Sequence, residues 1–287
     1  MMVVAAGKVA VIGSGTMGHG IAYVAAVAGH STVLSDSSSL ALAGAEKRIA
    51  SLFAKAIEKG KLDSEGAAEA KTRLTYELSL ERAVVGAALV LEAVPESLVL
   101  KQELLRSIEP LMPSGSIIAS NTSALSISEI ARALKRPERF IGMHFFNPVP
   151  AMRLVEIVRG EMTNDAVVEG ARAFAVGLGK TAIIVNDSPG FATSRLGVVL
   201  GLEAMRMLEQ GVASAVDIDR AMELGYNHPM GPLKLTDLVG LDVRLAIAEH
   251  LHSTLRDDTY KPPRILREMV SQGRLGQKSG RGFYDWS

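Results

Sequence analysis

The chain has 287 residues, beyond the usual single-domain size of about 100 to 200 residues, and 48% of them are hydrophobic, which is enough for two cores. Lysine plus arginine and aspartate plus glutamate both number 31, so no net charge draws the protein to nucleic acid or to a membrane surface. The absence of cysteine excludes disulfides, thiolate catalysis and cysteine-ligated metals.

The apolar segments indicate whether the chain spans a membrane or carries a signal peptide. No apolar run reaches the length of about 18 residues that a membrane span requires. The N-terminus is apolar but lacks the basic segment of a signal peptide. We therefore expect a cytoplasmic protein that binds neither nucleic acid nor a membrane.

The first predicted element is a strand over residues 9–12, a short run of apolar and β-branched residues. Three glycines follow with the spacing G-x-G-x-x-G: Gly13, Gly15 and Gly18. In this motif the first glycine permits a sharp turn, the second lets the backbone approach a pyrophosphate, and the third lets the next helix pack against the strand. The helix then presents its free N–H groups to an anion.

A second apolar strand, over residues 32–34, leads to Asp36. This residue stands roughly 20 positions after the glycines, where the dinucleotide-binding motif has an acidic residue. A carboxylate there accepts hydrogen bonds from both ribose hydroxyls of an adenosine and repels a 2′-phosphate. The sequence therefore predicts a Rossmann-type, doubly wound α/β sheet that binds NAD in preference to NADP.

Two helices are predicted next, over residues 40–59 and 64–73, as a hairpin inserted into the nucleotide-binding fold. One face of the first helix is apolar. Its other face carries polar and basic residues: Arg48, Ser51, Lys55 and Lys59. Such a face is usually just solvated, but it is also a place where a phosphate-rich substrate could bind.

Further strands are predicted over residues 89–94, 116–120, 140–146, 154–158 and 181–185. Polar residues follow two of them: Glu96 follows one, and Asn121, Thr122 and Ser123 follow the next. Ligands of open parallel sheets bind at this carboxyl end of the strands. These polar residues either form simple turns or line a site.

The pattern changes after residue 186 and is almost entirely helical beyond it. The predicted helices cover residues 191–210, 214–224, 233–255 and 263–272. We therefore expect a nucleotide-binding domain of residues 1–186 and a mainly α-helical domain of residues 187–287.

Two titratable residues, His144 and Glu156, lie inside hydrophobic strands. Burial of either group alone is costly, which favours a pairing of the two across neighbouring strands. A lone buried histidine is more often a structural core residue, whereas a His–Glu pair suits general acid–base catalysis, and the pattern favours the catalytic pair. His250 and His252 point to different faces of a helix, so no metal site is predicted.

Seven motifs, taken together and in order, make the chain resemble the L-3-hydroxyacyl-CoA dehydrogenases, including bacterial 3-hydroxybutyryl-CoA dehydrogenases. The motifs are GSGTMGHGIA, EAVPE, SNTS, HFFNPVP, PGF, HPMGP and KSGRGFY. Each alone is weak, but the set is specific and spans essentially the whole chain. The resemblance implies a Rossmann domain followed by a helical domain used for homodimerisation.

The resemblance also implies an activity: reversible NAD-linked oxidation of a 3-hydroxyacyl-CoA to the 3-ketoacyl-CoA. His144 would take the proton of the 3-hydroxyl group, Glu156 would orient and stabilise the imidazole, and Ser123 would hydrogen-bond the substrate oxygen. The implied NAD site comprises Gly13, Gly15, Thr16, Met17, Gly18, Asp36, Glu96, Lys101, Asn147 and Lys278. For CoA, the hairpin residues Ser51 and Lys55 are the candidates.

The chain departs from the family pattern at Ser194. Family members usually have an asparagine there, whose amide helps to bind the substrate. A serine hydroxyl is shorter and has a single polar atom, so we expect it to act in catalysis only through a water.

Three alternatives stay open at this point. Related enzymes with the same dyad act on substrates without CoA, such as L-carnitine or L-gulonate, and another group oxidises 3-hydroxyadipyl-CoA. Lens crystallins, which are structural proteins, also come from this superfamily. The intact His144 and Glu156 argue against a purely structural role, because a protein without chemistry gains little from an acid and a base in its core.

Overall fold

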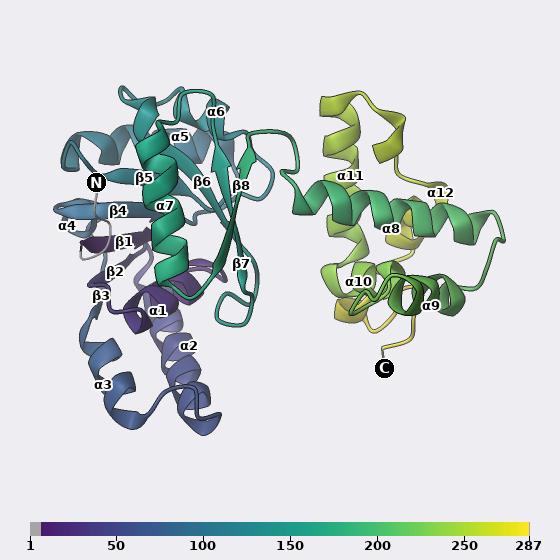
Figure 1. Cartoon of the computed structure of the whole chain (residues 1–287), viewed down its shortest axis with the longest axis horizontal. Coiled ribbons are helices and arrows are strands. Elements are labelled where there is room, and N and C mark those ends of the chain that lie inside the picture. The colour runs from purple at the N-terminus through teal and green to yellow at the C-terminus, as the bar shows by residue number, and fades with distance from the viewer. Residues whose placement is uncertain (1–6, 287) are drawn as a thin grey trace. The chain divides into compact units, whose positions relative to one another are not determined.

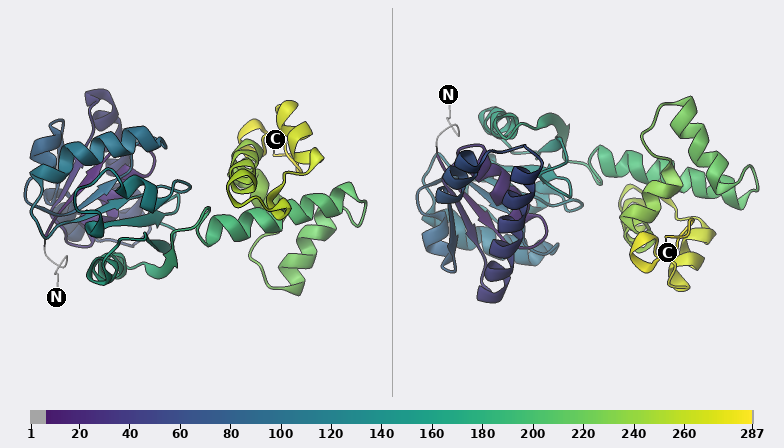
Figure 2. Two further views of the ribbon diagram at one scale, coloured as in Figure 1. Left: turned by 90° about the horizontal axis from the view of Figure 1, so that it is seen from above. Right: turned by 90° about the horizontal axis from the view of Figure 1, so that it is seen from below.

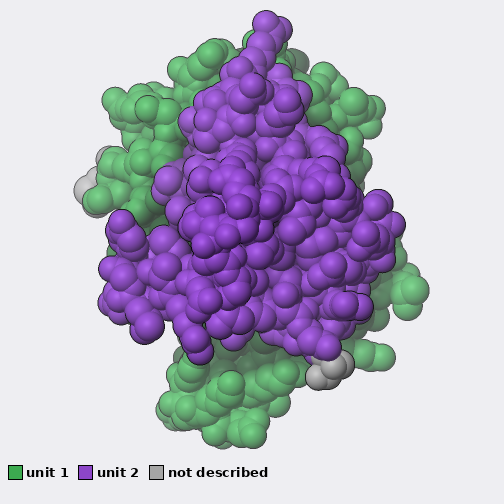
Figure 3. Space-filling model, turned by 90° about the vertical axis from the view of Figure 1, so that its right-hand side faces the viewer, with its two compact units in different colours: residues 1–188 green, residues 189–287 purple. Residues whose placement is uncertain are grey.

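The computed structural model describes residues 7–286 of the chain (Figure 1). The chain divides into two compact units, residues 1–188 and 189–287, which Figure 3 shows in green and purple. The division falls after Ser188, close to the position expected from the change in sequence pattern after Asn186. Each unit is described by itself below.

The first unit is built on an eight-stranded sheet in the order β3-β2-β1-β4-β5-β6-β7-β8. Its strands are β1 (Lys8–Ile12), β2 (Thr32–Ser35), β3 (Leu74–Glu77), β4 (Ala87–Glu92), β5 (Ile117–Ser120), β6 (Phe140–Phe145), β7 (Leu154–Arg159) and β8 (Thr181–Asn186). All neighbouring strands are parallel except β6 and β7, which are antiparallel. The strand order reverses between β1 and β4, which is the ligand-binding position of open α/β sheets.

Helices pack on both faces of this sheet (Figure 2). The helices of this unit are α1 (Gly18–Val27), α2 (Ser39–Glu58), α3 (Ser64–Thr72), α4 (Leu80–Val84), α5 (Leu98–Ile108), α6 (Ile127–Ala131) and α7 (Asp165–Gly177), with 3-10 turns η2 (Glu109–Leu111) and η3 (Pro137–Arg139). Of these, α2 packs on α1 and α3. Because the central strands are covered on both sides, they are buried along their length, as Val9 to Ile12 are in β1. The predicted Rossmann-type sheet and the hairpin helices α2 and α3 are confirmed.

Strand β3 and helix α4 were not predicted. Only Leu74 of β3 is buried, because this strand is the edge of the sheet and has one neighbour. A four-residue edge strand with one buried side chain carries little of the alternation by which strands are recognised.

The second unit is helical. It contains α8 (Thr193–Glu209), α9 (Ala215–Gly225), α10 (Pro232–Val239), α11 (Leu241–Leu255) and α12 (Arg264–Ser271), with 3-10 turns η4 (Asp258–Tyr260) and η5 (Gln277–Ser279). The single helix expected over residues 233–255 is wrong, because Gly240 separates α10 from α11. Its φ of 103° lies outside any right-handed helix and suits glycine. Similarly, α8 begins two residues after Phe191, whose φ is 47°.

Two negative findings apply to residues 7–286. No helix among them combines the length and the apolar character required to cross a bilayer. No group of three or more His, Asp or Glu side chains among them is arranged to hold a metal ion.

Candidate active site

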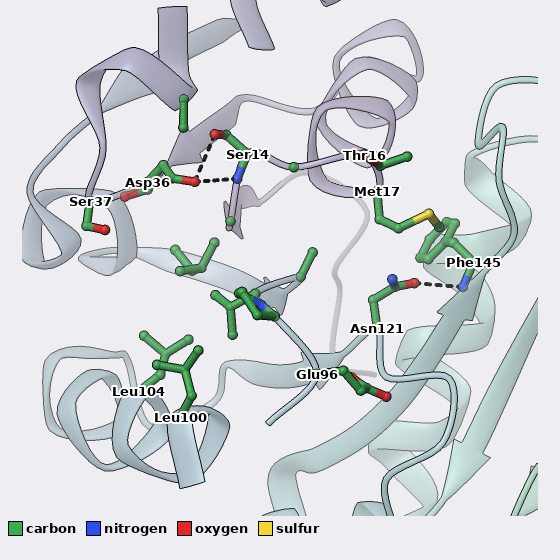
Figure 4. Close-up of a pocket in the computed structure, with 18 of the residues that line it drawn as sticks. Ser14, Thr16, Met17, Asp36, Ser37, Glu96, Leu100, Leu104, Asn121 and Phe145 are labelled. Carbon is green, nitrogen blue, oxygen red and sulfur yellow. Dashed lines mark hydrogen bonds between the residues drawn. The ribbon is translucent and has the colours of Figure 1, made fainter. Parts of the chain in front are cut away.

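The main cavity of the first unit, about 1060 Å³, lies at the carboxyl ends of β1, β2, β4, β5 and β6 (Figure 4). The glycine turn after β1 forms one wall. Gly13 has a φ of 100°, and a Cβ there would lie 2.5 Å from the carbonyl oxygen of Ala93. A Cβ on Gly18 would lie 1.7 Å from the Gly13 carbonyl oxygen, so α1 packs directly on the turn. At Gly15 no heavy atom beyond the glycine and its two chain neighbours lies within 4 Å of the Cβ position, which leaves the backbone open for close approach by a pyrophosphate.

Asp36 lies at the same cavity, immediately after β2 (Figure 4). Its Oδ2 accepts hydrogen bonds from the backbone N–H of Ser14, at 2.9 Å, and from the Ser14 hydroxyl, at 2.8 Å. Its Oδ1 accepts one from the backbone N–H of Ser38, at 3.0 Å. Burial raises the pKa of Asp36, but these hydrogen bonds outweigh it and hold the pKa below its ordinary value. The cavity therefore presents a fixed carboxylate where a ribose is expected.

Arg48 is the one lysine or arginine among the described residues that line this cavity. It comes from α2, and its Nη2 donates a hydrogen bond of 2.9 Å to the carbonyl oxygen of Ser14. The sequence placed Arg48 only on the polar face of the hairpin. Its position beside the glycine turn depends on how α2 packs, although the basic face itself was visible in the sequence.

His144 and Glu156 lie opposite each other on the antiparallel strands β6 and β7. The imidazole Nδ1 is 2.7 Å from Oε2 of Glu156, which is fully buried. His144 lines the main cavity, and the centroid of its ring lies 4.4 Å from that of Phe146. A carboxylate at Nδ1 holds the proton there and fixes the orientation of the ring, as a general acid–base group requires.

A polar loop follows β5 and brings Asn121 and Ser123 to the cavity. Oδ1 of Asn121 accepts a hydrogen bond of 2.9 Å from the N–H of Phe145, which joins the end of β5 to the end of β6 (Figure 4). The loop also binds Glu96, whose Oε1 accepts hydrogen bonds from the Thr122 hydroxyl, from Ser123 N at 3.1 Å and from Ala124 N at 3.2 Å. Ser123 and Glu96 thus face the same cavity as His144.

Electrostatics keep Glu96 in its charged form. Burial raises the pKa of this carboxyl, but the hydrogen bond from Thr122 and the positive charge of Lys101 outweigh it, so the pKa is lowered. Thr16, Met17 and Asn147 also line the cavity, and their role in binding the cofactor stays a prediction.

Lys101, a candidate for the cofactor site, lies next to Glu96. It is completely buried and is not among the residues that line the cavity. Its Nζ lies 2.6 Å from Oε1 of Glu92 and 3.2 Å from Oε2 of Glu96. Lys101 therefore contacts two carboxylates, one of which, Glu96, lines the cavity, and its binding to NAD stays a prediction.

A second cavity of the first unit, about 550 Å³, lies between α1, α2, the segment 148–153 and the end of α7. Its described lining includes five cationic residues and no aspartate or glutamate: Lys55, Lys59, Lys61, Arg153 and Lys180. Nζ of Lys180 donates to the carbonyl oxygens of Val149, at 2.6 Å, and Met152, at 2.7 Å, and burial lowers the pKa of this lysine. Of the two residues suggested for CoA, Lys55 lines this cavity and the exposed Ser51 does not.

Two candidates belong to the second unit. Ser194 is the second residue of α8. Lys278, in η5, donates a hydrogen bond of 2.6 Å to the carboxylate of Asp242, and this bond lowers the pKa of Asp242. Their assignment to the site stays a prediction.

Comparison with known proteins agrees with these features. Residues 8–188 match the family described as "3-hydroxyacyl-CoA dehydrogenase, NAD binding domain", and residues 190–286 match "3-hydroxyacyl-CoA dehydrogenase, C-terminal domain". A probable 3-hydroxybutyryl-CoA dehydrogenase of Bacillus subtilis is 44% identical, over 97% of each chain. The mitochondrial hydroxyacyl-coenzyme A dehydrogenase of Homo sapiens is 40% identical, over 97% of this chain and 90% of the relative.

A solved structure, that of (S)-3-hydroxybutyryl-CoA dehydrogenase from Ralstonia eutropha, has a TM-score of 0.94 and 42% identity. The similarity covers 98% of this chain and 99% of that one. The chain belongs to the 3-hydroxyacyl-CoA dehydrogenase family and is an NAD-dependent oxidoreductase.

Proposed function

We propose that the protein interconverts a 3-hydroxyacyl-CoA, such as (S)-3-hydroxybutyryl-CoA, and the corresponding 3-ketoacyl-CoA. The observation that carries this proposal is the buried His144–Glu156 pair at the wall of the cavity that also holds the glycine turn and Asp36. An acid–base pair and a dinucleotide site in one cavity are what a dehydrogenase of secondary alcohols requires. The names of the relatives supply the substrate class.

The chemistry divides between cofactor and protein. The glycine turn and Asp36 would hold NAD, which would supply the hydride acceptor for the hydrogen on C3. His144 takes the hydroxyl proton through Nε2, because Nδ1 is hydrogen-bonded to Glu156. The negative charge of Glu156 stabilises the imidazolium that forms, and Ser123 donates a hydrogen bond to the substrate oxygen. In the reverse direction His144 returns the proton.

The second cavity is the proposed site for the phosphate groups of CoA. Its five cations, with no aspartate or glutamate in the described lining, favour a polyanion. Lys55 lies in the last turn of α2 and Lys59, four residues later, is its C-cap, so both can meet the same group. The cavity argues against L-carnitine, because a cationic lining repels its trimethylammonium group, whereas 3-hydroxyadipyl-CoA stays an alternative.

We also propose a homodimer formed through the second unit. Its helices expose several large apolar side chains: Leu196, Leu200, Leu224, Leu235 and Leu238. Gly197 and Gly201 serve packing inside the unit, since a Cβ on either would lie within 3.2 Å of Arg244 and Thr236 respectively. A monomeric mass in light scattering at micromolar concentration would contradict the dimer.

A cytoplasmic location of the protein stays a prediction.

Turnover of acetoacetyl-CoA with NADH, followed by the loss of NADH absorbance, tests the proposed activity. We expect turnover with NADH and much less with NADPH. Two compounds without CoA are the controls: free acetoacetate, assayed with NADH, and L-carnitine, assayed with NAD. They test whether the enzyme requires the CoA part of the substrate. Equal efficiency with free acetoacetate, or turnover of L-carnitine alone, would overturn the substrate class.

A further inference from the structure

The carboxylate of Asp36 occupies a group of hydrogen-bond donors that could hold another anion (Figure 4). Its Oδ2 accepts from the N–H and from the hydroxyl of Ser14, and its Oδ1 accepts from the N–H of Ser38. Backbone N–H groups and hydroxyls gathered in this way are also the donors that bind phosphate oxygens in nucleotide sites. The chain therefore fills an anion-binding position with its own side chain.

Arg48 reaches the same position from helix α2. Its Nη2 donates a hydrogen bond of 2.9 Å to the carbonyl oxygen of Ser14. A Cβ on Gly44 would lie 3.3 Å from Nη1 of Arg48, so the side chain runs back along the helix over a residue that has no side chain of its own. Asp36 and Arg48 bind the two ends of Ser14, whose N and O atoms are at most about 4 Å apart, so the two charged groups lie within roughly 10 Å of each other.

The packing of α2 does not account for this position of Arg48. The residue is exposed, and within residues 7–286 its one hydrogen bond is that to Ser14. A guanidinium has several N–H donors, so most of them stay available to a ligand of the cavity. Their planar arrangement matches the oxygens of a phosphate better than any neutral group does. Next to the ribose-binding carboxylate, NAD has a 2′-hydroxyl group, whereas NADP has a phosphate.

We propose that Arg48 is a specificity-determining residue: with the donors of Ser14 and Ser38 it forms a binding site for the 2′-phosphate of NADP, which the carboxylate of Asp36 closes. The preference for NAD then comes from Asp36 alone, and Arg48 offsets part of the repulsion that Asp36 exerts on the phosphate. The inference rests on the proposed binding of NAD by the glycine turn and Asp36. It does not depend on the acyl-CoA substrate.

The dissociation constants of NADH and NADPH, measured by fluorescence, test this assignment without any substrate. In Arg48→Ala the Kd for NADPH should rise by about 3- to 10-fold, because a charged donor to the phosphate is lost in a partly solvated place. The Kd for NADH should stay within about twofold, since NAD carries no 2′-phosphate. Alanine is the best helix former, so the variant should keep the fold of α2.

The larger effect is expected once Asp36 is removed. Asp36→Ala frees the donors of Ser14 and Ser38, so the Kd for NADPH should fall by about 10- to 100-fold. In Asp36→Ala/Arg48→Ala most of this gain should disappear, with a Kd at least about fivefold weaker than in Asp36→Ala. Adenosine 2′,5′-bisphosphate and 5′-AMP, used as competitors of NADH, differ only in the 2′-phosphate. We expect the bisphosphate alone to bind more tightly to Asp36→Ala than to the wild type.

Lys47→Ala is the matched control. Lys47 is the exposed neighbour of Arg48 on α2 and lines neither cavity. Its replacement removes the same charge from the same helix, so it shows how much of any effect is long-range attraction between a cation and a phosphate. We expect both dissociation constants to stay within about twofold, alone and combined with Asp36→Ala, because solvent screens an exposed charge at this distance.

Equal tightening of NADPH in Asp36→Ala and in the double variant would overturn the proposal, because Arg48 would then make no contact with the phosphate. Equal weakening of NADH and NADPH in Arg48→Ala would also overturn it, since Arg48 would then bind the pyrophosphate that both cofactors carry. So would an equal effect of Lys47→Ala. A wild type that binds NADH but does not turn over acetoacetyl-CoA would count against the proposed substrate alone.

Discussion

The two cavities of the first unit have opposite electrostatic character. The main cavity carries Asp36, Glu96 and His144 together with one arginine, Arg48. The second carries five cations and no aspartate or glutamate in its described lining. The main cavity has groups that orient a ligand and exchange protons, whereas the second has groups that neutralise charge. The difference suggests that the reacting end and the phosphate-bearing end of the substrate are recognised at separate places.

A single helix supplies cations to both cavities. Arg48 and Lys55 of α2 and its C-cap Lys59 recur at intervals of seven and four residues and so fall on nearly one face. The rise of about 1.5 Å per residue places Lys55 about 10 Å further along the helix than Arg48. One basic face therefore reaches the glycine turn at one point and the second cavity at another.

Loss of the base should have the largest effect. His144→Ala removes the group that exchanges the hydroxyl proton, so we expect kcat to fall by about 10² to 10⁴, the usual worth of a positioned general base. The Kd for NADH should change little, since the glycine turn and Asp36 are intact. Steady-state kinetics measure kcat, and NADH fluorescence measures the Kd. If His144→Ala kept the kcat of the wild type, another group would have to be the base.

Cofactor choice comes next in expected magnitude. Asp36→Ala removes the carboxylate that accepts from the ribose and repels a 2′-phosphate, so the ratio of kcat/KM for NAD to that for NADP should fall by about 10- to 100-fold. Ser37→Ala, at a neighbouring residue of the same cavity, is the control and should leave the ratio close to that of the wild type. An unchanged ratio in Asp36→Ala would mean that another part of the cavity selects the cofactor.

The second cavity should affect substrate binding and leave the chemical step unchanged. In Lys55→Ala/Lys59→Ala we expect KM for acetoacetyl-CoA to rise about 5- to 30-fold at unchanged kcat, with a smaller rise at high salt because exposed charges are screened. Lys47→Ala, which changes an exposed lysine of α2 that lines neither cavity, is the matched control. If both variants raise KM equally, the cavity has no special role in binding CoA.

A substitution in the second unit should have the smallest effect. Ser194→Asn restores the residue usual in the family, and we expect kcat/KM to change by less than about tenfold, because one indirect hydrogen bond contributes roughly 1 kcal/mol. Assay of both proteins with acetoacetyl-CoA tests whether His144, Glu156 and Ser123 suffice for turnover. Activity found only in the variant would mean that this chain acts on a different substrate.

The sequence by itself determined the features that depend on local chemistry. The glycines of the first turn are required by backbone conformation and close approach, and Asp36 follows them at a spacing set by one helix and one strand. The apolar runs defined the central strands, because a strand covered on both faces must be apolar throughout. His144 and Glu156 were recognisable because charge is rare inside such runs.

Only the tertiary structure decided which distant residues meet. Lys101 lies on a helix whose sequence does not reveal that its ammonium is buried between Glu92 and Glu96. Arg48 reaches the glycine turn, and Lys180 the second cavity, through the packing of helices far apart in the chain. Glycine inside a helical pattern costs only about 1 kcal/mol, so the break at Gly240 was not visible until its φ of 103° was known. The spacing of apolar residues along a helix or strand indicates which of its faces is buried. The partner of each side chain is decided by contacts between elements that are far apart in the sequence.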